Sequence, residues 1–256
     1  MKIKGNTINE INYYLQNGYY QYQHVIISTQ EDIKYYDDHQ NEFLIKYEFT
    51  LYDCQKQAIV NIERGLHTMV VAPTATGKTL IGEYAIQRSL TNGKKAIYLS
   101  PLKALSNQKY HNFHFRFPHA KVGIRTGDIR NEEGDEDIMI YTAETLKGII
   151  TRNKRRMKDV EWLVIDEAQF VGDDSRGFVW ESILMDIPSH VKVLFLTASK
   201  SNQLEFMEWF GSMKECQTCY VETDFRPITL QHIEYRFSEN VIKEKQIKIA
   251  SSKKQT

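Results

Sequence analysis

The eight-residue run Ala72-Pro73-Thr74-Ala75-Thr76-Gly77-Lys78-Thr79 constrains the fold more than any other stretch, because its chemistry requires a strand before it and a helix after it. The apolar residues 69–71 precede the run, and the helical pattern of residues 80–86 follows it. A turn at Gly77 lets backbone N–H groups face phosphates, and the helix adds the positive end of its dipole. The sequence therefore predicts a nucleotide-binding loop. Its predicted binding residues are Thr74, Ala75, Thr76, Gly77, Lys78 and Thr79.

Two side chains of this loop have predicted roles of their own. Lys78 would place a full charge beside the terminal phosphates, and the Thr79 hydroxyl would ligate Mg²⁺. Ala72 stands where the usual pattern has glycine, although a small residue still permits the turn. The alternative is a chance Gly-Lys-Thr at a helix start, which the β-branched run before the loop disfavours.

Composition limits the class of protein without identifying its ligand. A chain of 256 residues, 41% of them hydrophobic, can bury the core of one large domain or two small ones. Its 33 basic and 33 acidic residues balance to a formal net charge of +0. This neutrality neither supports nor excludes a local nucleic-acid site.

Three further features predict an intracellular protein, either cytoplasmic or nuclear. The sequence has no apolar stretch of about 18 residues and no charged-then-apolar leader after Met1, so we expect no membrane span, no secretion and no membrane partner. Three cysteines, an odd and small number, suit a reducing compartment better than a disulfide scaffold.

Short apolar strands alternate with helical segments beyond the loop, which is typical of parallel strands buried on both faces. The predicted strands are 67–71, 95–99, 137–141, 162–165 and 191–196, with weaker β character at 24–28 and 42–49. The predicted helices are 51–65, 102–117, 143–151, 180–185 and 202–210. This order predicts a doubly wound α/β fold with a mostly parallel sheet. Ligands of such sheets bind at the carboxyl ends of the strands.

A pair of carboxylates follows one of these strands. Asp166 and Glu167 come directly after the apolar residues Val164 and Ile165. Asp166 is placed to hold Mg²⁺, and Glu167 to orient or deprotonate the water that attacks the terminal phosphoryl group. The alternative is a helix start with acidic residues, favoured there by the dipole. A phosphate loop in the same predicted sheet favours the catalytic interpretation.

Polar residues also follow the other strands. Thr197 and Ser199 end the last strong strand, where they could bond to the acidic loop or merely form a turn. The segment 100–109 begins a helix with a proline in its first turn and presents N–H groups, hydroxyls and lysines to phosphates. Thr126-Gly127-Asp128 and residues 141–146 lie at two further strand ends. Each of these signals is weak by itself.

Taken in order, these segments resemble the first motor domain of superfamily two nucleic-acid helicases, most closely the superkiller-type (Ski-like) DExH branch, over about residues 49–235. The matching segments are Gln55 (Q motif), 72–79 (motif I), 100–109 (motif Ia), 126–128 and 141–144 (nucleic-acid contacts), 166–169 (motif II), 197–199 (motif III) and 226–230 (exit segment). Their joint order and spacing are highly specific. The resemblance implies a RecA-like P-loop domain that uses ATP and Mg²⁺ to move along single-stranded nucleic acid.

The resemblance also implies roles for individual residues. Gln55 would read adenine. The implied nucleic-acid contacts are Pro101, Lys103, Thr126, Gly127 and Thr142, and the implied coupling residues are Gln169, Thr197 and Ser199. RNA is slightly favoured over DNA, although stacking and phosphate contacts are common to both. Gln169 departs from the family, which usually has histidine there, and Thr197-Ala198-Ser199 reverses the usual Ser-Ala-Thr.

The resemblance covers only half of a motor. The residues after Tyr235 are too few for a second α/β domain of about 150 residues, which in this family supplies arginine fingers. We expect an N-terminal extension (1–48), an ATP-binding domain (49–225), and an exit segment with a basic tail (226–256) that acts as a linker or is disordered. The second RecA-like domain would lie in a longer protein or in a separate chain. The alternative functions are a non-catalytic, ATP-dependent binding module and a P-loop ATPase unrelated to nucleic acid.

Three other features admit a functional and a structural interpretation. Cys216 and Cys219 have the spacing of half a zinc site, but no second pair exists, which favours ordinary thiols. The histidines at 111, 114 and 119 lie among aromatic residues and fit the two faces of a helix end. The basic run 152–158 is either a solvated face or a nucleic-acid contact.

Overall fold

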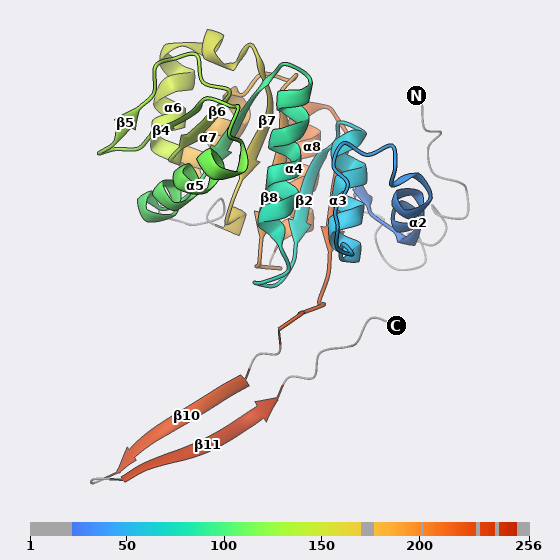
Figure 1. Ribbon diagram of the computed structural model, residues 1–256, viewed down its shortest axis with the longest axis vertical. Helices are drawn as coiled ribbons and strands as arrows, with labels where there is room; N and C mark the ends of the chain where they lie inside the picture. Colours follow the sequence, from blue (N-terminus) through green and yellow to red (C-terminus); the bar gives the residue numbers. More distant parts are fainter. Residues whose placement is uncertain (1–21, 170–176, 201, 229–230, 239–240, 250–256) are drawn as a thin grey trace.

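The computed structural model describes residues 22–169, 177–200, 202–228, 231–238 and 241–249 (Figure 1). Its centre is a nine-stranded sheet with the order β1-β9-β2-β8-β7-β3-β6-β4-β5. The strands are β1 (Val25–Ile27), β2 (His67–Val71), β3 (Lys95–Leu99), β4 (Val122–Arg125), β5 (Arg130–Asn131), β6 (Ile138–Tyr141), β7 (Val160–Ile165), β8 (Lys192–Thr197) and β9 (Thr218–Glu222). All neighbours pair in parallel except β4 with β5. The predicted mostly parallel α/β fold is confirmed.

Helices cover both faces of the sheet (Figure 1). They are α2 (Gln30–His39), α3 (Asp53–Glu63), α4 (Lys78–Thr91), α5 (Lys103–Arg116), α6 (Ala143–Arg152), α7 (Gly177–Asp186) and α8 (Gln203–Lys214), with a 3-10 turn, η1 (Lys154–Met157). One core cluster joins α2, α3, α4 and α5 to the sheet, and the other joins α6, α7 and α8 to it. The fold is therefore a three-layer sandwich.

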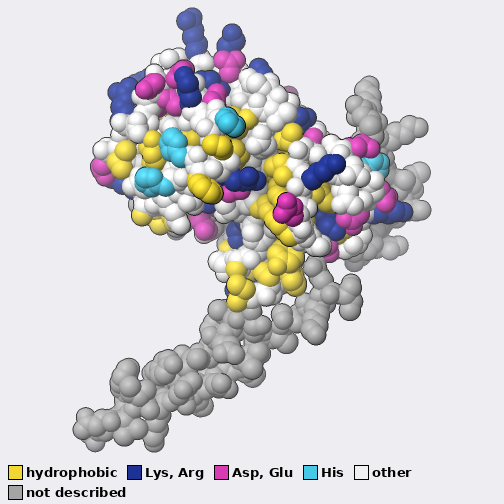
Figure 2. Space-filling view, in the orientation of Figure 1, with side chains coloured by type: hydrophobic (Ala, Val, Ile, Leu, Met, Phe, Trp, Pro, Cys, Tyr) yellow, Lys and Arg dark blue, Asp and Glu magenta, His cyan; other side chains and the backbone are white. Residues whose placement is uncertain are grey.

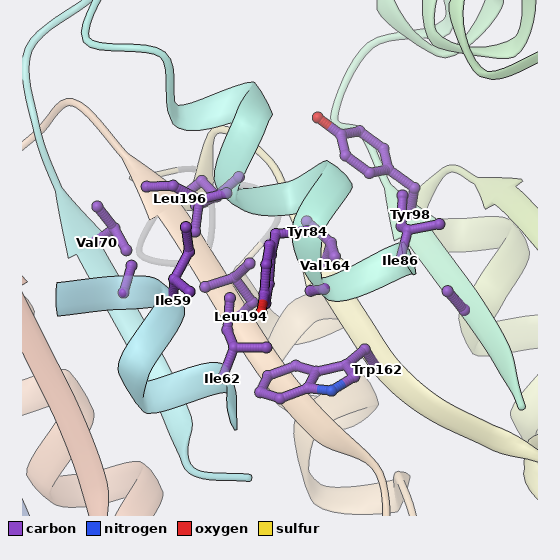
Figure 3. Packing of buried hydrophobic residues seen from close by; sticks show 14 of the residues in the cluster. Ile59, Ile62, Val70, Tyr84, Ile86, Tyr98, Trp162, Val164, Leu194 and Leu196 are labelled. Atoms are coloured by element: carbon purple, nitrogen blue, oxygen red, sulfur yellow. The ribbon is translucent and has the colours of Figure 1, made fainter. Parts of the chain in front are cut away.

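The central strands are apolar because both of their faces are covered. Alternate residues of β7 enter opposite clusters: Val164 packs with the α3–α5 helices, whereas Leu163 and Ile165 pack with α6–α8. Figure 3 shows the first cluster, to which α3 contributes Ile59 and the sheet contributes Trp162. This two-sided burial fixes the register, because a slip by one residue would exchange the two faces.

The segment before residue 49 contributes structure that the sequence only partly indicated. β1 pairs with β9 at the sheet edge, which confirms the β character of residues 24–28. The helix α2 was not predicted; it begins with a capping box at Thr29 and is tied to α3 by an ion pair between Asp32 and Arg64 of 2.6 Å. The predicted domain boundaries remain predictions.

Two other expectations were wrong. Residues 42–49 form a turn, bends and irregular backbone rather than a strand, and Phe43 packs into the core by stacking on Tyr36 with ring centroids 4.6 Å apart. The C-terminal tail, expected to be a linker or disordered, forms an antiparallel hairpin of β10 (Gln231–Ser238) and β11 (Val241–Ile249). Its charge suggested disorder, but the β-branched residues of 241–249 favour a strand.

A buried histidine makes the stability of this sheet dependent on pH. His67 begins β2, and its Nδ1 accepts a hydrogen bond of 3.0 Å from the Val193 N–H. Burial lowers the pKa of His67 to about 3, and Lys192 and Lys214 add to this effect. The folded protein therefore keeps this ring neutral through mildly acidic pH.

We predict that His67 removes about 2 kcal/mol of the free energy of unfolding between pH 7 and pH 5. The unfolded histidine binds a proton near its ordinary pKa of 6.5, whereas the folded one does so only near 3. This stability is thus complete above 6.5 and is lost as the pH falls. Urea unfolding of wild type and His67→Asn at both pH values measures it. The variant keeps an acceptor for Val193 and should have the shallower pH slope; equal slopes would contradict the assignment.

Candidate nucleotide and nucleic-acid site

The phosphate loop connects β2 to α4. Gly77 lies at the helix N-cap with φ 75°, and Ala75 also has a positive φ of 68°. The N-cap residue has no side chain to bond the first N–H groups of this helix, so a ligand can accept their hydrogen bonds. The Thr76 hydroxyl donates a hydrogen bond of 2.8 Å to the Pro73 carbonyl and shapes the turn. Such an uncapped helix end after a left-handed glycine fits a bound phosphate chain.

Lys78 lies inside this loop. Its ammonium donates hydrogen bonds to the carbonyls of Ala72 (2.7 Å) and Pro73 (3.0 Å). Burial lowers the pKa of Lys78, while the nearby carboxylates of Glu167 and Asp166 raise it. The lysine therefore lies within electrostatic range of both predicted catalytic carboxylates.

Gln55 lies behind the loop rather than at its surface. The side chain is 3% exposed, and its Nε2 donates to the Thr76 carbonyl at 3.0 Å while its Oε1 accepts from the Tyr52 N–H at 2.9 Å. The predicted role of Gln55 in reading adenine stays a prediction. Its observed contacts brace the phosphate loop against α3.

Asp166 follows β7 and has three polar neighbours. Its Oδ2 accepts a 2.5 Å hydrogen bond from the Tyr98 hydroxyl, and its Oδ1 accepts one of 3.1 Å from the Glu167 N–H. The Lys109 ammonium lies 3.9 Å from Oδ2 and donates a hydrogen bond of 3.0 Å to the Thr79 hydroxyl. The two predicted Mg²⁺ ligands, Thr79 and Asp166, thus share one neighbourhood.

Glu167 is linked to β8 through Gln169. The Gln169 Nε2 donates to Glu167 at 2.7 Å, and its Oε1 accepts from the Thr197 hydroxyl at 2.9 Å. The Thr197 hydroxyl also accepts a bond of 3.1 Å from the Ser199 N–H. The three predicted coupling residues therefore form one hydrogen-bonded chain that ends on the predicted catalytic glutamate.

The predicted nucleic-acid residues lie after β3, β4 and β6, which are neighbours in the sheet. Lys103 and Gly127 are exposed, and the Lys103 ammonium forms an ion pair with Asp128. The side chains of Thr126 and Thr142 are only 6% and 5% exposed. The surface here consists of exposed backbone and Lys103 rather than of the two threonine hydroxyls, and the predicted nucleic-acid contacts stay predictions. Pro101 lies half-buried in the loop before α5.

The other candidate features have mainly structural contacts. Within the basic run, Arg156 pairs with the buried Glu132 at 3.3 Å and Lys154 with Asp186 at 3.6 Å. Burial raises the pKa of the Cys219 thiol to about 12, and the described residues contain no group of three potential metal ligands among His, Cys, Asp and Glu.

Acidic and basic side chains are interspersed over the face shown in Figure 2. Within the described ranges, no helix has the length and apolar character to cross a membrane.

The contacts of three further residues with this site were not predicted, although Lys109 and Arg226 belong to segments that the resemblance identified. Tyr98 belongs to an apolar strand, where its hydroxyl was the only signal, and Lys109 was included only as the end of a phosphate-facing segment. Arg226 follows the sheet, and its guanidinium donates a 3.3 Å hydrogen bond to the Thr74 hydroxyl. The exit segment thus returns to the phosphate loop. The Thr223 N–H, just before this segment, donates a hydrogen bond of 3.0 Å to the Val71 carbonyl at the end of β2.

A family model for DEAD/DEAH box helicases matches residues 52–206, which include the phosphate loop, both carboxylates and Thr197. The chain belongs to the DEAD/DEAH box helicase family. It is 39% identical over 186 residues to Superkiller complex protein 2 of Homo sapiens and 38% identical over 183 residues to antiviral helicase SKI2 of Saccharomyces cerevisiae. These matches confirm the resemblance to superkiller-type helicases.

The match covers 73% and 72% of this helicase chain but only 14% of each superkiller protein. Among solved structures, the helicase Lhr of Mycobacterium smegmatis bound to ssDNA and AMP-PNP has a TM-score of 0.59 at 24% identity, over 68% of this chain and 26% of that one. The helicase MrfA bound to DNA has a TM-score of 0.58 at 19% identity, over 68% and 27%. Both structures show the fold.

We predict that Gly77→Ala destabilises this helicase domain more than Gly93→Ala. Both glycines have positive φ (75° and 64°), so an alanine costs about 1 kcal/mol in backbone strain at either position. At Gly77 the added Cβ would also lie 2.5 Å from the Gln55 Nε2, whereas nothing lies within 4 Å at Gly93. Displacing the Gln55 amide should cost about 1 kcal/mol more. Urea unfolding measures the difference, and a difference that persisted in a Gln55→Ala background would contradict this explanation.

Proposed function

We propose that this chain is the ATP-binding half of a Ski-like helicase motor, which binds ATP with Mg²⁺ at the phosphate loop and single-stranded nucleic acid at the ends of β3, β4 and β6. One observation carries this proposal: Lys78, Thr79, Asp166 and Glu167 come from two separate strand ends and converge at one edge of the sheet. The three free cysteines are compatible with an intracellular setting.

The residues of this site have separable tasks. The N–H groups at the start of α4 and the Lys78 ammonium would hold the β- and γ-phosphates, and Lys78 would exchange its loop carbonyls for phosphate oxygens. Thr79 and Asp166 would hold Mg²⁺, which supplies charge neutralisation to the phosphates. Two protein ligands suffice, because Mg²⁺ keeps several waters and phosphate oxygens in its shell.

Glu167 is the base of this proposal. Its carboxylate would accept a hydrogen bond, and then a proton, from the attacking water. The Gln169 amide holds one oxygen of this carboxylate at 2.7 Å and thereby fixes its orientation. Because Gln169 is also bonded to Thr197, a shift of the β8 end would alter the position of the base.

The proposed nucleic-acid track uses backbone and charge. Lys103 and the exposed turn at Gly127 would contact phosphates, which accounts for binding with little sequence preference. RNA is the favoured substrate of this proposal, because a similar protein of Arabidopsis thaliana is named an ATP-dependent RNA helicase. The second RecA-like half, in the same longer protein or a separate chain, would complete the track and supply arginine fingers.

We predict that Lys78→Ala abolishes ATP binding and leaves the fold intact. The ammonium supplies the only full positive charge within the loop, and its removal leaves the carboxylates Asp166 and Glu167 to repel phosphates. Fluorescence titration with a methylanthraniloyl ATP measures binding, and far-UV circular dichroism measures the fold. Lys94→Ala, an exposed lysine just beyond the other end of α4, is the matched control and should bind as wild type does. Undiminished ATP affinity in Lys78→Ala would refute the assignment.

We also predict that the purified chain binds ATP but turns it over slowly, with or without single-stranded RNA or DNA. Arginine fingers contribute about 10³-fold or more to phosphoryl transfer, and the proposal assigns them to the second half. A coupled ATPase assay measures turnover. Strong stimulation by nucleic acid would show that this chain, or a second copy of it, supplies the missing arginine. Nucleotide-dependent binding without turnover, even with a second motor half added, would favour the non-catalytic binding module.

A further inference from the structure

Lys109 occupies an unusual position for a lysine of an outer helix. It lies on α5, yet its side chain is only 12% exposed. Its ammonium points toward the first turn of α4 and the residue that follows β7, rather than toward solvent. The ammonium donates a hydrogen bond of 3.0 Å to the Thr79 hydroxyl and lies 3.9 Å from the Asp166 Oδ2. These two oxygens are the proposed protein ligands of Mg²⁺.

The surroundings of this ammonium are built for a cation. The Tyr98 ring lies beneath it, with the centroid 5.2 Å from Nζ, so that the negative face of the ring adds to the attraction. The Tyr98 hydroxyl donates to the same Asp166 oxygen, which orients the carboxylate toward the shared space. Three elements, β3, α4 and β7, thus each contribute a group to the place where the Lys109 charge lies.

Lys78 does not share this position. Its ammonium is bonded to the carbonyls of Ala72 and Pro73, on the phosphate side of the loop. The site therefore holds two lysines with different partners. Lys78 is bonded within the loop that is proposed to hold the phosphates, whereas Lys109 lies beside both proposed metal ligands.

We propose that Lys109 is a built-in counter-cation of the metal position, which Mg²⁺ must displace in order to bind Thr79 and Asp166. This inference rests on the proposed function of the site. A divalent ion and an ammonium within a few ångströms of each other repel strongly in a partly buried site, so the two cations exclude each other. Binding of Mg²⁺ with ATP is then an exchange that costs the Lys109 contacts.

The exchange has a consequence for α5. Lys103, six residues earlier on this helix, lies beside the exposed turn at Gly127 and pairs with Asp128. Displacement of Lys109 removes the polar anchor that holds α5 to Thr79. Metal loading would therefore act directly on the helix whose first turn is proposed to contact nucleic acid.

The experiment is a Mg²⁺ titration of methylanthraniloyl-ATP binding to wild type, Lys109→Met and Lys109→Gln. Removing the competing charge should lower the Mg²⁺ concentration at the midpoint by about fivefold or more in both variants, the scale of an ordinary coupling between two ligands. Arg116→Met is the matched control, because it also removes a cation from α5. Arg116 forms its ion pair with Glu83, at 3.1 Å, and not with the proposed metal ligands. Its midpoint should equal that of wild type.

Thermal melting with Mg²⁺ alone gives a second readout that needs no nucleotide. Without Mg²⁺ the Lys109 variants should melt below wild type, because Asp166 has lost its cation. Added Mg²⁺ should raise their melting temperatures by more than it raises that of wild type. Using two variants keeps the test decisive, since Gln retains a donor for Thr79 while Met retains the apolar stem.

An unchanged or higher Mg²⁺ midpoint in both folded variants would overturn the inference. So would weaker ATP binding at saturating Mg²⁺, which would make Lys109 a phosphate ligand instead. Lys78→Ala, measured in parallel, separates this failure from failure of the proposed function. Binding that requires Lys78 but shows no change in the Lys109 variants refutes the counter-cation alone, whereas binding that does not require Lys78 refutes the nucleotide site itself.

Discussion

The parallel register of the central strands is the constraint on which the site depends. Val71 pairs with Thr197, and Ile165 pairs with both Phe195 and Leu99, so the chain leaves β2, β8, β7 and β3 at one edge of the sheet. The polar residues that follow these strands are therefore brought together at that edge. Residues on alternate faces of each strand are buried in different clusters, so a slip of one residue in the pairing would disrupt the packing of both clusters. The positions of the site residues are thus determined by apolar packing far from the site.

Charge balance within this edge explains how four ionisable groups can be kept so close together. Of these four groups, Lys78 and Lys109 are cations and Asp166 and Glu167 are anions, so their formal charges cancel, and Arg226 adds one positive charge beside the loop. Each group also has a neutral hydrogen-bond partner: loop carbonyls for Lys78, Thr79 for Lys109, Tyr98 for Asp166 and Gln169 for Glu167. In the proposed function, phosphates would replace the loop carbonyls as partners of Lys78, and a divalent metal would replace Lys109 as the partner of Thr79 and Asp166.

The fold and the centre of the site followed from the sequence because their signals are local. Apolar runs followed by polar residues identified β2 and β7, and the phosphate loop identified its own helix. The segments of Arg226 and Lys109 were identified, but their contacts with the site were not: Arg226 returns to the loop after β9, and Lys109 reaches the site from the second turn of α5. The buried position of Gln55 was equally inaccessible, since the Q-motif resemblance gives a residue but not the direction of its amide. The strand predicted at 42–49 failed because Phe43 packs into the core without joining the sheet.

Gln169 stands where the resemblance to the superkiller-type branch implies a histidine, and this difference has a definite physical consequence. The Gln169 amide donates to Glu167 and accepts from Thr197 at the same time, and these two roles are fixed at every pH. A neutral imidazole could play both roles, but a protonated one has two donors and could no longer accept from the Thr197 hydroxyl. The link between the proposed base and the end of β8 therefore survives acidification here, where a histidine would break it. A protonated histidine would also place a positive charge beside Glu167, which the neutral Gln169 amide does not do.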